Sequence, residues 1–224
     1  MRIAIQLYSL FLKNSKPVWR SSAYNFRYTA KYSNKMAEKT ALLLISDGSE
    51  EMEAVITADV LRRGGVSVTI ASLGDSECVK CSREVKICAD TKLANVNDKE
   101  KYDVIILPGG LGGAKAFAES AEVGQLLQKQ EKENKLIAAI CAAPTALKAH
   151  GIAKGKKITS YPAMKDQMTD GYEYLEDRVV IDGNLITSRG PATAFAFGLA
   201  LVEKLVSKEK AINVAKGMLY EDYK

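Results

Sequence analysis

The chain has 224 residues, of which 47% are hydrophobic and 26% are charged, as in an ordinary globular protein of one or two domains. Its formal net charge of +5 comes from the N-terminus, since residues 1–35 contain seven Lys or Arg and no Asp or Glu. Residues 36–224 keep 25 basic side chains against 27 acidic ones, so the domain has no electrostatic footprint for nucleic acid. No apolar run reaches the roughly 18 residues that a membrane span requires.

Residues 1–35 are basic, free of acids and rich in Ser, Tyr and Asn, which is typical of mitochondrial presequences. We therefore predict a leader and a location in mitochondria, in the cytoplasm or in both. Two alternatives stay open: a disordered extension without a targeting role, and a secretory signal built on the apolar stretch 3–12. Met36 opens the segment MAEKTALLLIS, which suits the start of a compact domain, so the predicted domain spans residues 36–224.

From residue 40 onward, short apolar runs alternate with helical periodicity, and this pattern predicts βαβ units in a doubly wound, mostly parallel α/β sheet. In chain order, we expect buried or short strands at 41–45, 66–73, 104–107, 136–140 and 157–160. We expect helices over 50–63, after 113, from about 145 to His150, over 193–206 and over 208–218. Two hairpins complete the domain, a small one over 78–89 and a second with strands 179–181 and 185–187.

Ligands of such folds gather at the carboxyl ends of the parallel strands, where the loops 46–53, 108–113 and 141–145 should meet. Cys141 follows a buried strand and precedes a helix, which exposes its side chain on a strained turn. A helix N-terminus stabilises anions, so we expect it to lower the pKa of this thiol. The alternative is an inert, buried structural cysteine.

Three acids, Glu50, Glu51 and Glu53, begin the first helix, where acids favour the helix dipole whatever their role. We select Glu53, because its position points inward at the end of the sheet. Burial beside a thiolate would raise the pKa of its carboxyl and let it donate a hydrogen bond to sulfur. The glycines at 109–113 either form a simple turn or bring backbone N–H groups toward a developing oxyanion.

The remaining cysteines are Cys78, Cys81 and Cys88, and we expect all of them to be reduced, because a domain of this size needs no disulfide. Cys78-x-x-Cys81 has no second pair of ligands and gives little support for zinc or a redox dithiol. His150 is the single histidine, and we expect it to cap its helix. This leaves no histidine for a peptidase or an amidotransferase site.

Five segments, in order and at matching spacing between Lys39 and the C-terminal region, carry a resemblance to a known family. They are EEME (50–53), KCSR (80–83), LPGGLG (107–112), LIAAICAAPT (136–145) and ITSRGP (186–191). They are similar to segments of the Parkinson disease protein 7 family, within the ThiJ/PfpI superfamily. The leader is not covered.

The resemblance implies a flavodoxin-like fold, a homodimer, and a cysteine that is both a nucleophile and an oxidation sensor. It assigns these roles to Cys141 and the partner carboxyl to Glu53. By the same resemblance, Gly110 and Ala142 supply backbone donors, and Arg83, Arg189 and Pro191 line or approach the pocket. Tyr161 stands where several relatives carry a histidine, and Ala143 where many have glycine. A proton relay must therefore use Tyr161 or water.

Two functions follow from this resemblance. The first is a glyoxalase or deglycase without metal or cofactor, acting on methylglyoxal, glyoxal and their early protein adducts and protecting against oxidative stress. The second is a redox sensor and chaperone-like protein, in which Cys141 is oxidised to the sulfinate with little catalysis. Both functions use the same site.

Overall fold

The computed structural model describes residues 38–96, 101–221 and 223. The chain divides into two units, Met1–Met36 and Ala37–Lys224, and only the second contains described residues. The predicted leader lies outside the described residues, so its role stays a prediction. Within the described part of the chain, no helix combines the length and apolar character needed to cross a membrane.

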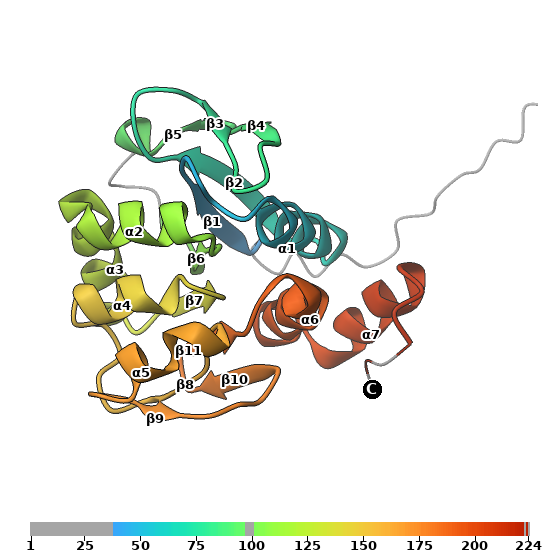
Figure 1. Ribbon diagram of the computed structural model, residues 1–224. Coiled ribbons are helices and arrows are strands. Elements are labelled where there is room, and N and C mark those ends of the chain that lie inside the picture. The colour runs from blue at the N-terminus through green and yellow to red at the C-terminus, as the bar shows by residue number, and fades with distance from the viewer. Residues whose placement is uncertain (1–37, 97–100, 222, 224) are drawn as a thin grey trace, which may run out of the picture. The chain divides into compact units, whose positions relative to one another are not determined.

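A seven-stranded sheet forms the centre of the domain, in the order β10-β11-β7-β6-β1-β2-β5 (Figure 1). Its strands are β1 (Thr40–Ile45), β2 (Ser67–Ser72), β5 (Thr91–Lys92), β6 (Val104–Leu107), β7 (Leu136–Ile140), β10 (Val179–Asp182) and β11 (Leu185–Ser188). Every neighbouring pair is parallel except β10 and β11. The predicted doubly wound, mostly parallel α/β fold is confirmed.

Helices cover both faces of this sheet (Figure 1). One face carries α1 (Glu51–Arg63), α6 (Ala194–Leu205) and α7 (Lys208–Gly217), and the other carries α2 (Leu111–Glu119), α3 (Ala121–Lys132), α4 (Pro144–Ala149) and α5 (Lys165–Met168). In β1, Leu43 and Ile45 pack in the first core, and Leu42 and Leu44 pack in the second. Burial on both faces explains why this strand is an uninterrupted apolar run.

The predicted helix after residue 113 differs from the structure in two respects. It begins earlier, at Leu111, inside the glycine-rich segment, and it is two helices, α2 and α3. Ser120 separates them, because its side chain accepts a hydrogen bond from the Val123 N–H and caps α3. The predicted strand at 157–160 is present as the shorter β8 (Lys157–Ile158). Several other short elements lay below the reach of periodicity: β9 (Glu173–Tyr174), and the 3₁₀ turns η1 (Leu93–Asn95), η2 (Pro162–Met164) and η3 (Pro191–Thr193).

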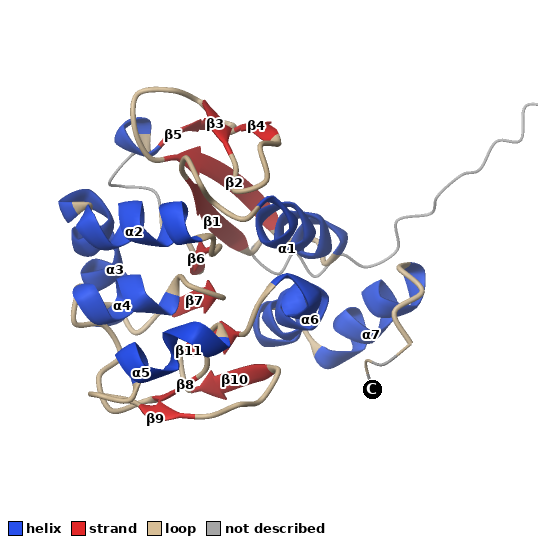
Figure 2. Cartoon of the chain, viewed as in Figure 1, coloured by secondary structure: helices blue, strands red, loops and turns tan. Residues whose placement is uncertain are grey.

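The predicted hairpin over 78–89 is present as β3 (Cys78–Lys80) and β4 (Lys86–Cys88), a two-stranded sheet of its own (Figure 2). A disulfide joins Cys78 to Cys88, whereas Cys81 and Cys141 are free thiols. The expectation that all four cysteines are reduced is therefore wrong for this pair. The antiparallel register places Cys78 directly opposite Cys88, and sequence spacing alone does not reveal such an opposition.

Candidate active site

The three predicted loops meet at the carboxyl ends of β1, β6 and β7. The Glu50 N–H donates to the Gly109 carbonyl at 2.9 Å. In return, the Gly109 N–H donates to Glu53 Oε2 at 2.7 Å. The loops after β1 and β6 are thereby tied together beside Cys141, the residue that follows β7.

Cys141 has a positive φ of 65°, in the left-handed region that non-glycine residues seldom occupy. Its backbone is fixed on both sides. Its N–H donates to the Ser188 carbonyl at 3.0 Å, and its carbonyl accepts from the Tyr161 N–H at 2.7 Å. Strained backbone of this kind persists only where the surroundings impose it, and it is concentrated at functional sites. The predicted strained turn between strand and helix is confirmed.

Glu53 is fully buried on the first turn of α1 and accepts the Gly109 hydrogen bond. Burial raises the pKa of its carboxyl to about 7, and the charge of Glu50 adds to the rise. Hydrogen bonds from Gly109 and Cys141 act in the opposite direction. The prediction of a buried carboxyl with a raised pKa is confirmed, and the group takes up and releases a proton near neutral pH.

The expected lowering of the Cys141 pKa is wrong. Burial, and after it the charge of Glu53, raise the pKa of this thiol to about 12. The backbone N–H groups of Gly110 and Ala142 hydrogen-bond the sulfur and oppose the rise, but they do not outweigh it. Loss of hydration and a neighbouring carboxylate are therefore stronger than the stabilisation of the thiolate by these two N–H donors.

Cys141 opens into a cavity of about 560 Å³. The lining residues come from all three loops, from the β3–β4 hairpin, from the segment after β8 and from the start of η3: Gly48, Glu50, Ser82, Arg83, Gly110, Leu111, Gly112, Cys141, Ala142, Tyr161, Ala163, Met164 and Pro191. The structure thus brings six of the eight candidate residues onto one cavity wall. Glu53 is fully buried and is not among the residues that line the cavity.

Arg189 is the candidate that the structure does not bring to the cavity. Its guanidinium donates to the Glu176 carbonyl at 2.8 Å, and the residue is not among those that line the cavity. Tyr161 does line it and is 45% exposed, but its hydroxyl has no hydrogen-bond partner among the described residues. His150 ends α4 as predicted, with Nε2 2.8 Å from the Phe117 carbonyl oxygen.

Sequence reasoning missed Glu50 and Ser82 as cavity residues. The Ser82 hydroxyl lies 2.6 Å from Glu50 Oε2 and 2.9 Å from Glu51 Oε2, and it donates to this pair of carboxylates. The neighbouring Arg83 N–H donates to Glu51 Oε1 at 2.9 Å. These bonds anchor the tip of the hairpin to the start of α1. The only signal in the sequence was an acidic pair followed, 32 residues later, by a Ser-Arg turn.

Gly109 leaves no space for a side chain between the two key residues. A Cβ at this position would lie 2.5 Å from Cys141 Cβ, 2.8 Å from Glu53 Oε2 and 2.9 Å from the Ile140 carbonyl oxygen. We expect Gly109→Ala to lower the free energy of unfolding by about 1–3 kcal/mol, as overpacking does, and to displace both side chains. Urea unfolding measures the effect. Gly217→Ala is the control, because its Cβ would meet nothing within 4 Å. An equal loss of unfolding free energy in Gly217→Ala would contradict overpacking as the cause.

The fold and the site together define a doubly wound α/β protein with a cysteine–carboxyl pair at the carboxyl end of its sheet. Residues 39–204 match the model of the DJ-1/PfpI family. The chain belongs to this family, which confirms the resemblance drawn from its five segments.

Individual relatives agree with this assignment. The Parkinson disease protein 7 homolog of Danio rerio is 51% identical over 189 residues, which cover 84% of this chain and 100% of that protein. The glutathione-independent glyoxalase DJR-1.2 of Caenorhabditis elegans is 46% identical over 182 residues, or 80% of this chain and 96% of that protein. The crystal structure of Drosophila melanogaster DJ-1beta superposes with a TM-score of 0.79 at 57% identity, covering 81% of this chain and 98% of that one. A family that includes a glyoxalase supports an enzyme of this kind.

Proposed function

We propose that this protein is a cysteine-dependent, cofactor-free glyoxalase or deglycase, acting on methylglyoxal, glyoxal and their early protein adducts. The observation that supports this most is the pairing of Cys141 with a buried carboxyl whose pKa is about 7, beside two backbone N–H donors. Such a carboxyl exchanges protons near neutral pH, as general acid–base catalysis requires. The name of the Caenorhabditis elegans relative supports aldehydes as substrates.

In the first step, ionised Glu53 takes the proton of the Cys141 thiol while the sulfur attacks the aldehyde carbon. The carbonyl π bond breaks and a C–S bond forms, so the oxygen becomes an alkoxide. The N–H groups of Gly110 and Ala142, which already hydrogen-bond the sulfur, stabilise this charge. Glu53 then returns its proton to the oxygen, which leaves a hemithioacetal.

In the second step, Glu53 takes the proton from the former aldehyde carbon while water protonates the neighbouring carbonyl oxygen, which gives an enediol. Glu53 then delivers its proton to the neighbouring carbon, and the hydroxyl on the sulfur-bearing carbon gives its proton back to water as the new C=O bond forms. This converts the hemithioacetal into a thioester without any net oxidation or reduction. Water hydrolyses the thioester, releasing lactate from methylglyoxal, or glycolate from glyoxal, and restoring the thiol. Early protein adducts release the same aldehydes reversibly, so they enter the pathway at the first step.

Lactate formation from methylglyoxal by the purified full-length chain, in glutathione-free buffer containing a chelator, tests this proposal. We expect turnover that is proportional to protein concentration and unaffected by the chelator. Lactate formation no faster than in buffer alone would contradict the enzyme.

Tyr161 has no part in proton transfer in this proposal, because its hydroxyl has no partner among the described residues and its ring lies at the exposed rim of the cavity. We expect Tyr161→Phe to keep kcat within about threefold of the original value, well below the 10²–10⁴-fold effect of losing a general acid or base. Steady-state kinetics with methylglyoxal measures this. A hundredfold loss of kcat would assign the relay to Tyr161 instead of Glu53.

A second function, a redox sensor, is supported by one observation: the Oε1 atom of Glu53 is buried and lacks a hydrogen bond to the described residues. A protonated Glu53 could donate from this oxygen to an oxidised Cys141 sulfur. Peroxide would convert the thiol to the sulfinate, consuming two equivalents and adding two oxygen atoms. Chaperone-like binding belongs to this second proposal, whereas protection against oxidative stress belongs to the first.

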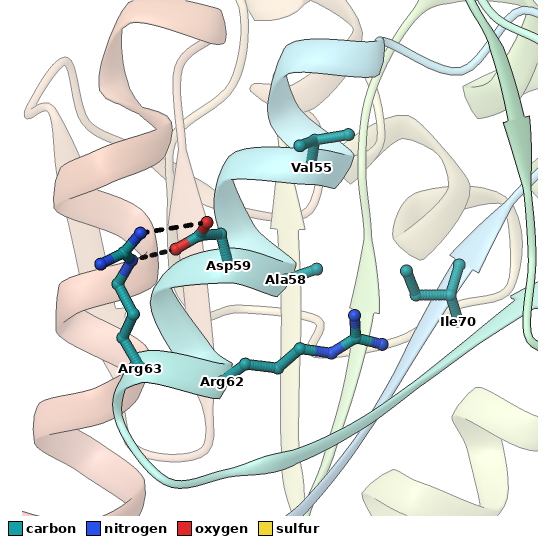
Figure 3. A pocket seen from close by; sticks show the side chains of 6 residues that line it. All are labelled: Val55, Ala58, Asp59, Arg62, Arg63 and Ile70. Atoms are coloured by element: carbon teal, nitrogen blue, oxygen red, sulfur yellow. Dashed lines mark hydrogen bonds and ion pairs between the residues drawn. The ribbon is translucent and has the colours of Figure 1, made fainter. Parts of the chain in front are cut away.

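We also propose that the protein forms a homodimer through α1. Met52 and Val55 are 51% and 53% exposed on this helix. Beside them lies a hollow of about 570 Å³, lined by Val55, Ala58, Asp59, Arg62, Arg63 and Ile70 (Figure 3). Both signs of charge occur in this patch, so two copies related by a two-fold axis can meet with complementary charges.

Val55→Lys is expected to convert the dimer to a monomer, because two lysines would face each other across the axis. Light scattering coupled to size-exclusion chromatography measures the mass. Ile181→Lys, an equally exposed position on β10, is the control and should leave the mass unchanged. A monomeric unmodified protein would contradict the dimer.

Residues 1–35 are proposed as a mitochondrial leader, on their composition alone.

A further inference from the structure

The β3–β4 hairpin has two chemically different faces. Its register pairs Cys78 with Cys88 and Lys80 with Lys86, and all four residues are exposed. The alternate residues Val79, Cys81 and Ile87 pack against the core formed under α1 and α6. Two cysteines and two lysines therefore share one solvent-facing surface, which lies outside the cavity of Cys141.

The strand register accounts for the choice of partner. The Ala89 N–H donates to the Glu77 carbonyl at 2.8 Å, so the adjacent pair Cys78 and Cys88 is a non-hydrogen-bonded pair. Opposite side chains approach most closely at such pairs, and here the Cα atoms are 3.9 Å apart. Cys81 points to the other face, and burial, aided by the charges of Glu51, Glu50 and Asp47, raises the pKa of its thiol to about 11. The Cys81 thiol is therefore a poor competitor for a disulfide bond with Cys78 or Cys88.

The exposed face of the hairpin favours thiol chemistry. Lys80 pairs with Glu84 at 2.8 Å, whereas Lys86 forms no ion pair or hydrogen bond with the described residues. A lysine ammonium beside exposed thiols favours the thiolate, which is the reactive form. It also attracts small anionic disulfides and thiols.

The hairpin connects this surface with the cavity. Its tip carries Ser82 and Arg83, which line the cavity wall. Two backbone N–H groups of the hairpin donate to the loop after β1. The Lys80 N–H donates to the side-chain Oδ1 of Asp47 at 2.7 Å, and the Ser82 N–H donates to the Ser49 carbonyl at 2.8 Å. Each strand has only three residues, too few for an isolated hairpin to be stable, so the disulfide holds the open end.

We propose that Cys78 and Cys88 form a second redox site of this protein, a reversible dithiol–disulfide couple that is independent of Cys141 and controls the order of the cavity wall at Ser82 and Arg83. The oxidant is a peroxide and the reductant is a small monothiol. The couple does not depend on the proposed aldehyde chemistry, because it operates without Cys141.

Oxidation removes two electrons and two protons from the pair. One thiolate attacks peroxide, the O–O bond breaks, and a sulfenic acid forms with release of hydroxide. The second thiolate attacks the sulfenic sulfur, forming the S–S bond and expelling the other oxygen as hydroxide, and the two hydroxide ions take up the two thiol protons as water. For reduction, one external thiolate attacks the disulfide to give a mixed disulfide, and a second external thiol displaces the first, leaving two protein thiols and one external disulfide.

The couple is tested on the full-length chain carrying Cys141→Ser, in glutathione buffers of graded ratio and after hydrogen peroxide, with differential alkylation and peptide mass spectrometry. We expect Cys78 and Cys88 to change state together, with a common midpoint and full reversal, while Cys81 stays a thiol. Cys78→Ser should leave Cys88 with a single bound glutathione. Thiols that persist through both oxidants, pairing with Cys81, or a disulfide that excess reduced glutathione does not open would each overturn the proposal.

Limited trypsin digestion measures the effect on the wall. We expect cleavage after Arg83 and Lys86 to be about tenfold faster in the dithiol form than in the disulfide form, because the closed loop restricts opening. The double variant Cys78→Ser/Cys88→Ser should match the dithiol form and should not respond to redox state. Equal rates in the two forms of the unmodified hairpin would overturn its control of the cavity wall.

Discussion

Replacing Cys141 with Ser is expected to lower kcat/KM for methylglyoxal by at least about 10³-fold, as the removal of a nucleophile does in other enzymes. Glu53→Gln is expected to lower it by about 10²–10⁴-fold, the usual effect of losing a general acid or base. Both follow from one arrangement. The Cys141 thiol, whose pKa is about 12, is unreactive unless a neighbouring base takes its proton, and the fully buried Glu53 is that base.

Two variants control for nonspecific damage. Glu119→Gln removes an exposed acid at the end of α2, and Glu122→Gln removes an exposed acid in the first turn of α3. Neither residue lines the cavity. Both should retain activity. A Cys141→Ser protein that still forms lactate at the original rate would contradict the proposed nucleophile.

The pH profile provides a further check on the pair. Because Glu53 must lose its proton before it can accept the proton of the thiol, kcat/KM should rise as the pH passes through about 7. The profile of Glu53→Gln should lack this rise. A flat profile for the unmodified protein would contradict the role of Glu53 as the base.

Glu53→Gln is also expected to stabilise the protein at about pH 8, by on the order of 3 kcal/mol, while it destroys activity. The pKa of Glu53 is raised in the folded state, from 4.5 to about 7. Between these values the folded protein holds a proton that the unfolded chain has lost, so its stability falls as the pH rises through this window. Above about pH 7 the folded protein bears the whole cost of a buried charge.

A neutral glutamine avoids that cost and can still accept the Gly109 hydrogen bond through its amide oxygen. The gain should shrink toward zero near pH 4.5, where Glu53 is protonated in both states. Urea unfolding of the full-length chain at several pH values measures this difference. The difference in unfolding free energy between Glu53→Gln and the unmodified protein should be larger at pH 8 than at pH 5. A smaller difference at pH 8 would contradict the cost of a buried charge.

Glu51→Gln is the matched control, two residues away on the same helix. Burial raises the pKa of Glu51, but hydrogen bonds from backbone N–H groups and from Ser82 outweigh it, so the net shift is a lowering. Its charge therefore stabilises the folded state above the usual pKa, and that contribution is lost as the pH falls. We expect Glu51→Gln to be destabilising at about pH 8, opposite in sign to Glu53→Gln.

Much of the fold could be predicted because strands buried on both faces are continuous apolar runs. The predicted bounds of Val104–Leu107 and Leu136–Ile140 agree with β6 and β7. Local rules also placed Cys141 on its strained turn. The short elements β5, β9 and α5 could not be predicted, because two to four residues do not establish a period.

The errors concern properties that depend on tertiary packing. The pKa of Cys141 was predicted from the helix that follows it, but burial and Glu53, which is 88 residues away in sequence, determine its direction. The Cys78–Cys88 disulfide depends on strand register, which spacing does not fix. Arg189 lies two residues before the cavity residue Pro191, yet its side chain turns away to Glu176.

The central claim is that the substrate becomes covalently bound to Cys141. Quenched-reaction mass spectrometry of the full-length chain with methylglyoxal tests this claim directly. We expect one methylglyoxal unit on the peptide that contains Cys141, appearing before lactate and disappearing as the substrate is consumed, and no such species in Cys141→Ser. Lactate formation with no adduct on Cys141, or with adducts only on Cys81, lysine or arginine, would contradict the account.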